Sequence, residues 1–475
     1  MKRAVILALL LAGACTPGPK PDLGVAQPPA RPGETITPAN GAAQTLVVGS
    51  LVERGWWKRF DSPELNALVD QALAANNDLA AADAALKQAR ALARAAKGDL
   101  GPQLDAGFTA DRSRVSNRIS SPLIDVTEND YTLSTATLSV SYPVDLFGLG
   151  RNQLRSARAR ARAAAFQLDA ARTTVVSNLV VAVITQAALD AQYQAAQASI
   201  TSNREILRLI EARQRLGELG KADVAQQATA LANAEAALPP LERARQHQRA
   251  LILTLIGQPA GGALPPLPSL DALTLPDQLP LSLPGDIVAH RPDVRAAQAA
   301  VEGAANDVGA AIAARLPQLT INGSFGGASE RIGSLFVPGN LFFSVVGGIS
   351  QPIFHSGALK ARQRAAEAAL EGAQAQYREA ALQAYLDVDD AIAGLRTDAT
   401  ALDAATRART AAAQSLDFTR RQAKLGQVGT LQLLSASAAD AQAAQALVQA
   451  RAARLSDTVA LFQATGTDSL PEGGR

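Results

Sequence analysis

Two hydrophobic patterns alternate along this chain, and each of them occurs twice. Stretches with helical periodicity follow Pro143 and Pro352, and no proline interrupts them before Pro239 and Pro471. Proline in a helix interior costs about 3 kcal/mol or more, so these gaps permit very long helices. From Pro143 to Gly217 is 74 residues (217 − 143). One helix of that length would measure roughly 110 Å. The pattern predicts an extended coiled structure rather than a compact core.

The second long stretch carries a heptad seam. Its apolar residues recur with spacings of 3-4-3-4-3, as in the a and d positions of a coiled coil, at Tyr385, Val388, Ile392, Leu395, Ala399 and Leu402. Glycine-bearing segments at 216–220 and 425–429 then end each long helix and reverse the chain. We therefore predict two antiparallel helical hairpins, at about 146–257 and about 355–465.

The pattern changes to period two between Pro102 and Pro143, and again between Pro317 and Pro352. The alternating apolar positions are Leu104, Ala106 and Phe108, then Leu138, Val140 and Tyr142, then Leu341, Phe343, Val345, Gly347 and Ile349. Each interval predicts two strands, at about 103–142 and about 318–351. Strands of about ten residues have the length that a tilted membrane strand needs. Two ordinary soluble hairpins would give the same alternation.

The chain contains itself twice. Pro143 is matched by Pro352 at an offset of 209 (352 − 143), and Gly217 by Gly426 at the same offset. Nearer the N-terminus, Pro102-Gln103-Leu104 reappears at 317–319, an offset of 215 (317 − 102). The six-residue difference (215 − 209) falls in the strand-pair interval, most simply in the loop that joins the strands.

A long repeat of this kind defines the domains. We assign residues 51–260 to the first copy and 285–466 to the second, with a Pro/Leu-rich linker at 261–284 and a tail at 467–475. The copies differ at Pro239-Pro240, which matches Val448-Gln449 and interrupts only the first return helix. Two unequal hairpins can move separately. We expect the hairpin of the second copy to be the one that moves when the structure opens.

The N-terminus predicts export. Lys2-Arg3 precedes an apolar segment at 4–14, which is too short to span a bilayer as a helix. Cys15 follows directly and is the only cysteine. We predict a signal peptide at 1–14, lipidation of Cys15, and an extended tether at 15–50 that is rich in Pro and Gly. A spare cysteine inside an ordinary signal peptide is the alternative.

The strand count has a consequence for assembly. Two copies give four strands, and a sheet in lipid cannot leave its edges unpaired. Single-chain barrels start at about eight strands, so four cannot close one. We predict an α+β membrane protein in which three chains share a twelve-stranded barrel that continues into long helical hairpins.

Composition argues against other classes of function. Hydrophobic residues make up 48% of the chain but aromatic residues only 4%, which suits closely packed helices rich in alanine. The 45 basic and 43 acidic residues balance to +2, so we expect no nucleic-acid partner. His247, His290 and His355 are isolated in the sequence, and we expect no metal site, no cofactor and no enzymatic activity.

Four motifs together resemble one family. They are Trp56-Trp57-Lys58-Arg59-Phe60-Asp61, Asn76-Asn77-Asp78-Leu79, His290-Arg291-Pro292-Asp293-Val294-Arg295 and Leu316-Pro317-Gln318-Leu319. In this order, on a duplicated frame, they resemble the TolC-like outer membrane efflux proteins, in particular their NodT-type lipoprotein branch. The resemblance covers residues 51–466.

The resemblance implies a function and its partners. It implies a homotrimeric, passive exit duct in the outer membrane of a Gram-negative-type cell, reaching into the periplasm and exporting small molecules such as drugs. A periplasmic adaptor and an inner-membrane pump would complete the assembly. The residues that it implies at the adaptor are the hairpin tips, Leu216, Gly217, Gly220, Leu425, Gly426 and Gly429. A lipid-anchored coiled-coil protein without a pore is the alternative function.

The resemblance also implies a periplasmic gate. Many members of the family place an acidic residue in the second return helix, in a Leu-Leu-Asp-Ala setting. This chain has Ser435 at that place, in Leu433-Leu434-Ser435-Ala436. Asp440, five residues further on, is the candidate substitute.

Replacing Cys15 tests the predicted lipid anchor. Cys15→Ala is expected to abolish acylation, which would be measured by incorporation of labelled palmitate, and to weaken membrane anchoring. The strands still insert, so the protein stays in the membrane fraction. Recovery of the variant as a soluble monomer would contradict the predicted membrane strands.

Overall fold

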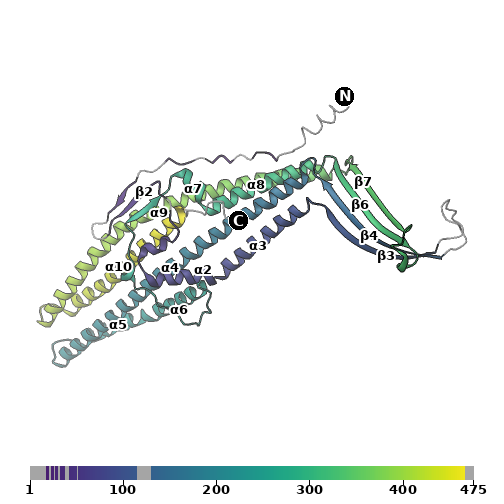
Figure 1. Cartoon of the computed structure of the whole chain (residues 1–475). Helices are drawn as coiled ribbons and strands as arrows, with labels where there is room; N and C mark the ends of the chain where they lie inside the picture. The colour runs from purple at the N-terminus through teal and green to yellow at the C-terminus, as the bar shows by residue number, and fades with distance from the viewer. Residues whose placement is uncertain are drawn as a thin grey trace. The chain divides into compact units, whose positions relative to one another are not determined.

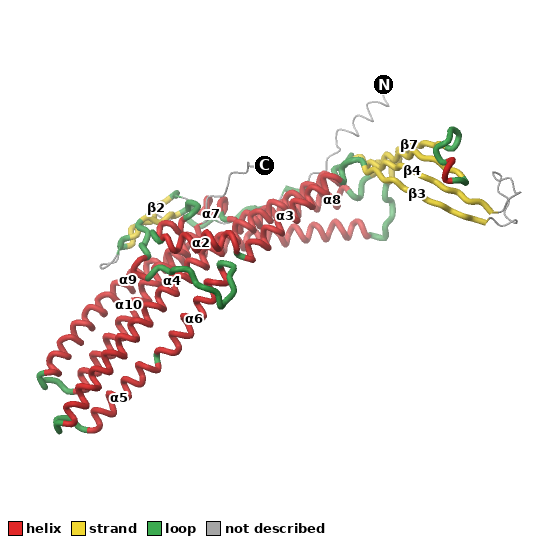
Figure 2. The backbone as a smooth tube through the Cα atoms, turned by 60° about the horizontal axis from the view of Figure 1, so that its bottom comes forward, coloured by secondary structure: helices red, strands yellow, loops and turns green. Residues whose placement is uncertain are grey.

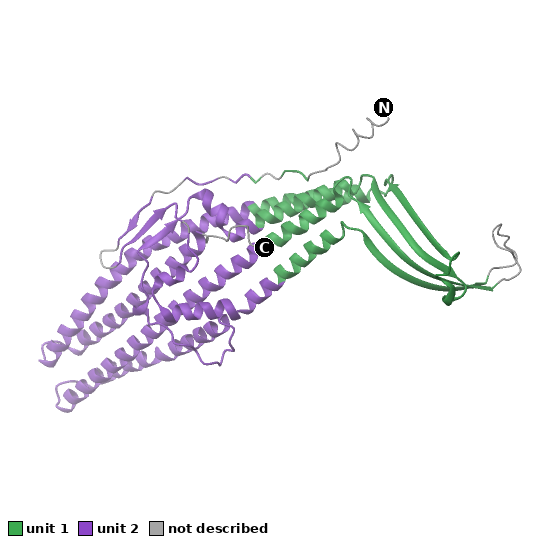
Figure 3. Cartoon of the chain, viewed as in Figure 1, with its two compact units in different colours: residues 1–23, 85–164, 297–377 green, residues 24–84, 165–296, 378–475 purple. Residues whose placement is uncertain are grey.

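The structure is a computed structural model that describes residues 18–20, 23–25, 27–29, 33–37, 42–50, 52–114 and 130–465. Contacts divide the chain into two compact units (Figure 3). Unit 1 comprises 1–23, 85–164 and 297–377, and unit 2 comprises 24–84, 165–296 and 378–475. The predicted Cys15 anchor, signal peptide and C-terminal tail lie outside the described residues.

Unit 1 contains a four-stranded antiparallel sheet in the order β3-β4-β6-β7 (Figure 1). Its strands are β3 (Gln103–Arg114), β4 (Asp130–Val144), β6 (Gln318–Ser329) and β7 (Leu341–Ser350). The short 3-10 helix η3 (Ile332–Ser334) lies between β6 and β7. The four strands that the period-two pattern predicts are therefore present, and β4 joins the first copy to the second by pairing with β6.

Each strand pair begins directly after a helix of 22 residues, α3 (Asn77–Gly98) or α8 (Pro292–Ala313). Two glutamines at equivalent positions make the connection. The side chain of Gln103 donates to the carbonyl of Gly98, and that of Gln318 donates to the carbonyl of Ala313. Carbonyls in the last turn of a helix lack partners within the helix. The repeated Pro-Gln-Leu motif thus caps a helix and starts a strand.

The long helices agree with the proline spacing. α4 (Leu149–Arg215) and α9 (Ala358–Lys424) each contain 67 residues, at the 209 offset (358 − 149). The first return path is split into α5 (Lys221–Ala236) and α6 (Leu238–Leu255), whereas the second is the single helix α10 (Thr430–Thr465). The break at Ala237 directly precedes the predicted interruption at Pro239-Pro240. In each hairpin the long helix and its return path lie side by side (Figure 2).

The core of unit 2 is helical. On the predicted seam of α9, Val388, Ile392, Leu395 and Ala399 are buried. Among the described helices, only α4 is long and apolar enough to cross a membrane, but 61% of its apolar window is buried inside the chain. That burial identifies the window as helical core rather than as a membrane span.

Three family motifs form joints within unit 2. Trp56 and Phe60, in the 3-10 helix η1 (Trp56–Phe60), are buried, and the Trp56 ring stacks on Phe462 of α10 at 5.2 Å. Arg291, between α7 (Pro284–His290) and α8, donates to Asp387 of α9 at 2.8 Å and to the carbonyl of Ala464 at 3.2 Å. Asn76, between α2 (Pro63–Ala75) and α3, donates to the carbonyl of Leu255 at 2.9 Å. The motifs are structural joints.

A small three-stranded sheet was not predicted. β1 (Thr35–Ile36) pairs with β2 (Gln44–Val48), which pairs in parallel with β5 (Gln278–Leu281). The predicted tether and linker therefore contact each other in unit 2, where the linker also holds the 3-10 helix η2 (Leu270–Ala272). The side chain of Gln44 donates to the carbonyl of Pro276 and to the hydroxyl of Thr458 on α10, both at 3.1 Å.

The six-residue difference between the copies is divided between a loop and a strand. Fifteen residues separate β3 from β4 and eleven separate β6 from β7, which accounts for four of the six (15 − 11). The other two lie in the last strands, because Pro143 is 13 residues beyond the start of β4 and Pro352 is 11 beyond the start of β7. The expectation that the loop alone differs was therefore incomplete.

Candidate functional site

The four-stranded sheet has one apolar and one polar face. Residues paired directly across antiparallel strands share a face, and the pairs Leu104↔Val140, Leu138↔Phe325 and Phe325↔Phe343 connect apolar residues across all four strands. The opposite face contains mainly Ser, Thr, Asn and Asp, with Tyr131, Leu133, Phe342 and Val346 as apolar exceptions. An apolar outer band and a polar interior are the features of a membrane barrel wall.

The hairpin tips have the same backbone geometry in both copies. Gly217 and Gly426 have φ of 80° and 75°, which favours glycine. The amides that follow them, of Glu218 and Gln427, each donate to a carbonyl five residues earlier at 3.0 Å. This is the Schellman arrangement that ends a helix. The predicted tip glycines therefore terminate α4 and α9.

The remaining tip residues have different environments. Leu216 and Leu425 are 75% and 73% exposed, although leucine at a helix end could have packed inward. Gly220 precedes α5, and its amide donates to the side chain of Asp223 at 3.1 Å. Gly429 directly precedes α10. Each tip thus combines a rigid glycine turn with an exposed leucine.

The two tips pack against each other behind these leucines. A buried apolar cluster joins the hairpins, with partly buried Leu219, Val224 and Val428 against it; its members are Ile206, Ile210, Leu416, Ala423, Leu433 and Ala436. Two arginines add links between the copies. Arg213 of α4 donates to the carbonyl of Lys424 at 3.3 Å, and Arg420 of α9 donates to the hydroxyl of Ser202.

The two candidate gate residues do not form one site. Ser435 is exposed on α10. Asp440 is partly buried and forms an ion pair with Arg409 of the neighbouring α9. Five residues correspond to about 140° around a helix, so the two side chains point in different directions. The ion pair gives Asp440 a structural role inside the second hairpin.

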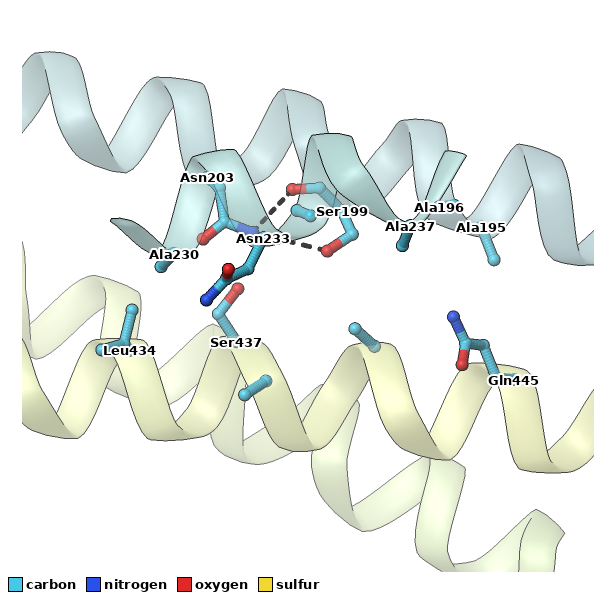
Figure 4. Close-up of a pocket in the computed structure, with 13 residues that line it drawn as sticks. Ala195, Ala196, Ser199, Asn203, Ala230, Asn233, Ala237, Leu434, Ser437 and Gln445 are labelled. Atoms are coloured by element: carbon cyan, nitrogen blue, oxygen red, sulfur yellow. Dashed lines mark hydrogen bonds between the residues drawn. The ribbon is translucent and has the colours of Figure 1, made fainter. Parts of the chain in front are cut away.

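A cavity of about 360 Å³ lies between the hairpins, lined by α4, α5 and α10 (Figure 4). Its wall is mostly alanine with a few short polar groups. Asn203 donates to the backbone and side-chain oxygens of Ser199, at 2.9 and 3.4 Å, and accepts from buried Gln227 at 3.1 Å. Ser437 and Gln445 face it from α10. The hairpins are therefore separated by space here, whereas the buried cluster at Ile206, Ile210 and Leu433 joins them nearer the tips.

A buried charged cluster in the second hairpin was missed by the sequence analysis. Arg454 of α10 is 1% exposed, and its Nη2 donates to the carbonyl of Ala42 at 3.4 Å, while Nε and Nη1 have no hydrogen-bond partner among the described residues. Beside it, Asp398 of α9 adjoins Asp457 of α10. Burial and the Asp457 carboxylate raise the pKa of Asp398 to about 6, and burial also raises the pKa of Asp457.

The equivalent place in the first copy is built differently. Arg245, at the 209 offset from Arg454 (454 − 209), forms ion pairs with Asp190 at 2.6 Å and Glu242 at 2.9 Å and lies over the ring of Tyr193. Leu189 stands where the second copy has Asp398. Asp398 and Asp457, the two acids with raised pKa values, both lie in the second hairpin. The one sequence signal was a carboxylate directly beside the heptad seam.

No described group of three or more His, Cys, Asp or Glu side chains is arranged to hold a metal ion. The three histidines stay separate along the chain, and His290 contacts the carbonyl of Asp286. Among the described residues, the features that recur in both copies are the unpaired strand edges, the polar face of the sheet and the hairpin tips.

Comparison with known proteins gives the family. The family model described as "Outer membrane efflux protein" matches residues 68–258 and 283–467. These segments overlap the two predicted copies. The chain is 30% identical over 466 residues to the pyoverdine export outer membrane protein OpmQ of Pseudomonas aeruginosa, covering 98% of this chain and 96% of that protein. It is 28% identical to the toluene efflux pump outer membrane protein TtgC of Pseudomonas putida, over 90% of this chain and 88% of that one.

Solved outer membrane proteins share the fold of this chain. The outer-membrane channel OprN matches with a TM-score of 0.86 and 27% identity, covering 96% of this chain and 99% of that one. The outer membrane protein VceC of Vibrio cholerae matches with a TM-score of 0.80 and 27% identity, covering 87% and 98%. The α+β channel fold expected from the sequence is confirmed.

The acidic cluster predicts a pH dependence. An unfolded chain gives Asp398 its ordinary pKa of about 3.9, whereas the folded chain raises that pKa to about 6. The folded state holds the extra proton, so the favourable contribution is present at low pH and is lost as pH rises through about 6. Asp398→Asn is expected to gain melting temperature over the wild type progressively from about pH 4 to about pH 7, and to keep that gain unchanged at higher pH.

Thermal unfolding followed by circular dichroism would measure this difference. Glu379→Gln, which removes an exposed carboxylate from the same helix, is the matched control and should show no such trend. A difference between Asp398→Asn and wild type that does not vary with pH would show that the pair does not share a proton.

Proposed function

The chain belongs to the outer membrane efflux protein family, and from this premise we propose that it is the passive exit duct of a tripartite efflux pump. Three copies would form a channel through the outer membrane that receives small molecules from an inner-membrane transporter and a periplasmic adaptor. The observation that carries the proposal is the four-stranded sheet, with one apolar face, one polar face and two unpaired edges.

The wall of the duct follows from the sheet and the hairpins. Three sheets would close a twelve-stranded barrel, with the polar face lining the lumen and the apolar face in lipid. In the periplasm the hairpins of α4, α5, α6, α9 and α10 would surround the same passage. Such a wall needs no cofactor, because transport energy would come from the inner-membrane partner.

The cargo is proposed only as a class. The printed names of the relatives refer to pyoverdine export and to toluene efflux. Neither cargo carries over as such, and we propose small organic molecules as the exported class. Deletion of this protein followed by a sensitivity panel of antibiotics, dyes, solvents and metal salts would identify the compounds.

Two features, a lipid anchor and an inserted barrel, would hold the protein at the outer membrane. Lipidation of Cys15 would tether the chain to the inner leaflet of the outer membrane, and the barrel would insert independently. The tether would run through β1 and β2, which contact β5 and α10.

The hairpin tips are the proposed adaptor contact. Leu216 and Leu425 are exposed at equivalent turns, next to Gly217, Gly220, Gly426 and Gly429. Exposed apolar side chains on a rigid turn suit a partner with an apolar groove. The periplasmic constriction would lie behind them, near Ser435 and the Arg409–Asp440 pair, and movement of the second copy stays a prediction.

Changing both tip leucines tests the adaptor contact. Leu216→Glu with Leu425→Glu alters exposed side chains only, so folding is expected to be unchanged, whereas adaptor capture falls at least about tenfold, or about 1.4 kcal/mol. Affinity pull-down from solubilised envelopes measures it. Glu379→Lys, an exposed change on α9 outside the tip, is the control. Normal capture by the double variant would exclude the tips as the contact.

Single-channel recording in planar bilayers tests the duct itself. The wild type is expected to be constricted, and Arg213→Ala with Arg420→Ala to conduct more, because these arginines link the tips of the two copies. The purified protein should be trimeric in detergent. Monomeric protein, together with no conductance even from the loosened variant, would favour a coiled-coil protein without a pore.

A further inference from the structure

The sheet of one chain ends in two unpaired strands, β3 and β7. Their outer backbone groups have no strand partner among the described residues, and in lipid each such unpaired group is strongly unfavourable. All three strand pairings are antiparallel, so β3 and β7 run in opposite directions. β7 of one chain can therefore pair antiparallel with β3 of another chain.

The internal repeat supplies the register of that pairing. β6 is equivalent to β3 at an offset of 215, and β7 to β4 at an offset of 209. Applying these offsets to Gln103↔Ser141 gives Gln318↔Ser350, and applying them to Gly107↔Thr137 gives Asn322↔Val346. All ten residue pairs of β6 and β7 follow the same rule. The two copies thus share one register.

The junction between copies can be transferred in the same way. Inside one chain this junction is β4 with β6, where Val140 pairs with Gly323. Adding 209 to the residue number of Val140 and subtracting 215 from that of Gly323 places Ile349 opposite Phe108 of the next chain. The pair Val144↔Leu319 likewise places Ile353 opposite Leu104 of the next copy.

The faces of the sheet agree with this register. Ile349 and Phe108 are 72% and 55% exposed, and both lie on the apolar face. Ile353 and Leu104 are 89% and 63% exposed. A shift by one residue would put the apolar face of one copy beside the polar face of the next. The transferred register instead makes the apolar band continuous and covers four exposed side chains.

The helices next to the sheet give an independent check. In unit 1, α4 contacts α8 through the ion pairs Arg162–Glu302 and Arg160–Asp307, the second at 2.7 Å. Transfer by the same offsets places Glu371 of α9 against Lys87 of α3 in the next copy. The order of charges is reversed, yet the charges remain opposite.

The second transferred pair is apolar. Arg160 becomes Ala369, and Asp307 becomes Leu92, which is exposed in the single chain. Both partners of each pair have changed together, and each new pair remains complementary. Such paired change is expected where the two positions meet.

We propose that neighbouring copies meet in this register, with Ile349 opposite Phe108, Ile353 opposite Leu104, and Glu371 paired with Lys87. The proposal rests on the proposed trimeric duct and gives its subunit interface residue by residue. It also explains why the first and second repeat copies would alternate around a ring of three chains. α9 against α8 would oppose Glu371 to Glu302, and α4 against α3 would oppose Arg162 to Lys87, and like charges disfavour such pairings.

Disulfide cross-linking tests the register. Phe108→Cys with Ile349→Cys should give covalent dimers and trimers on non-reducing gels after mild oxidation of membranes, because directly opposite Cβ atoms are about 5 Å apart. Controls displaced by two residues, Ala106→Cys or Ala110→Cys with Ile349→Cys, should cross-link several-fold less, because diagonal neighbours are about 7–8 Å apart. Single-cysteine variants account for any contribution from Cys15.

The outcomes separate this inference from the proposed function. Stronger cross-linking in a displaced pair would overturn the register while leaving the trimeric duct intact. No cross-linking in any pair, from protein that sediments as a monomer, would overturn both.

Charge exchange tests the helical contact. Lys87→Glu and Glu371→Lys are each expected to lower the temperature at which trimers dissociate, and the double exchange should restore most of the loss. Arg162→Glu with Glu302→Arg, the pair within one chain, is the matched control and should affect dissociation less than folding. A double exchange no more stable than the sum of its single changes would exclude the Glu371–Lys87 pair.

Discussion

Unpaired backbone hydrogen-bonding groups cannot remain in lipid, and the architecture of this chain depends on that constraint. Each copy of the repeat supplies two strands, and one chain supplies four with an open edge on each side. Because a four-stranded sheet in lipid cannot close on itself, the proposed duct needs other chains to complete its barrel. In that barrel the apolar face of the sheet would contact lipid, and the polar face would line a passage.

The duplication makes such completion simple. The junction between copies inside the chain, β4 with β6, and the proposed junction between chains, β7 with β3, are the same kind of contact. The helical hairpins of the two copies nevertheless differ, and such a difference is what would let one hairpin move while the other stays fixed. α5 and α6 are separate while α10 is continuous. The first hairpin pairs Arg245 fully, whereas the second leaves Arg454 beside two acids whose pKa values are raised.

Much of the fold could be predicted because proline and period-two spacing are local signals. They located the four strands, the two 67-residue helices and the turns at Gly217 and Gly426. The sheet of β1, β2 and β5 could not be predicted, because β1 has only two residues and β2 pairs with the linker strand β5 some 230 positions further along the chain. The Asp398–Asp457 cluster depends on how α9 meets α10. The gate was predicted from a family position and stays a prediction, whereas the ion pair of Asp440 with Arg409 had no signal in the sequence.

A cryo-electron microscopy map of the full chain, purified in detergent, would test the central claim most directly. The account predicts a threefold ring with a closed barrel of twelve strands, in which β7 of each copy is hydrogen-bonded to β3 of the next. Single chains with open sheets, or a barrel closed through different strand edges, would contradict it.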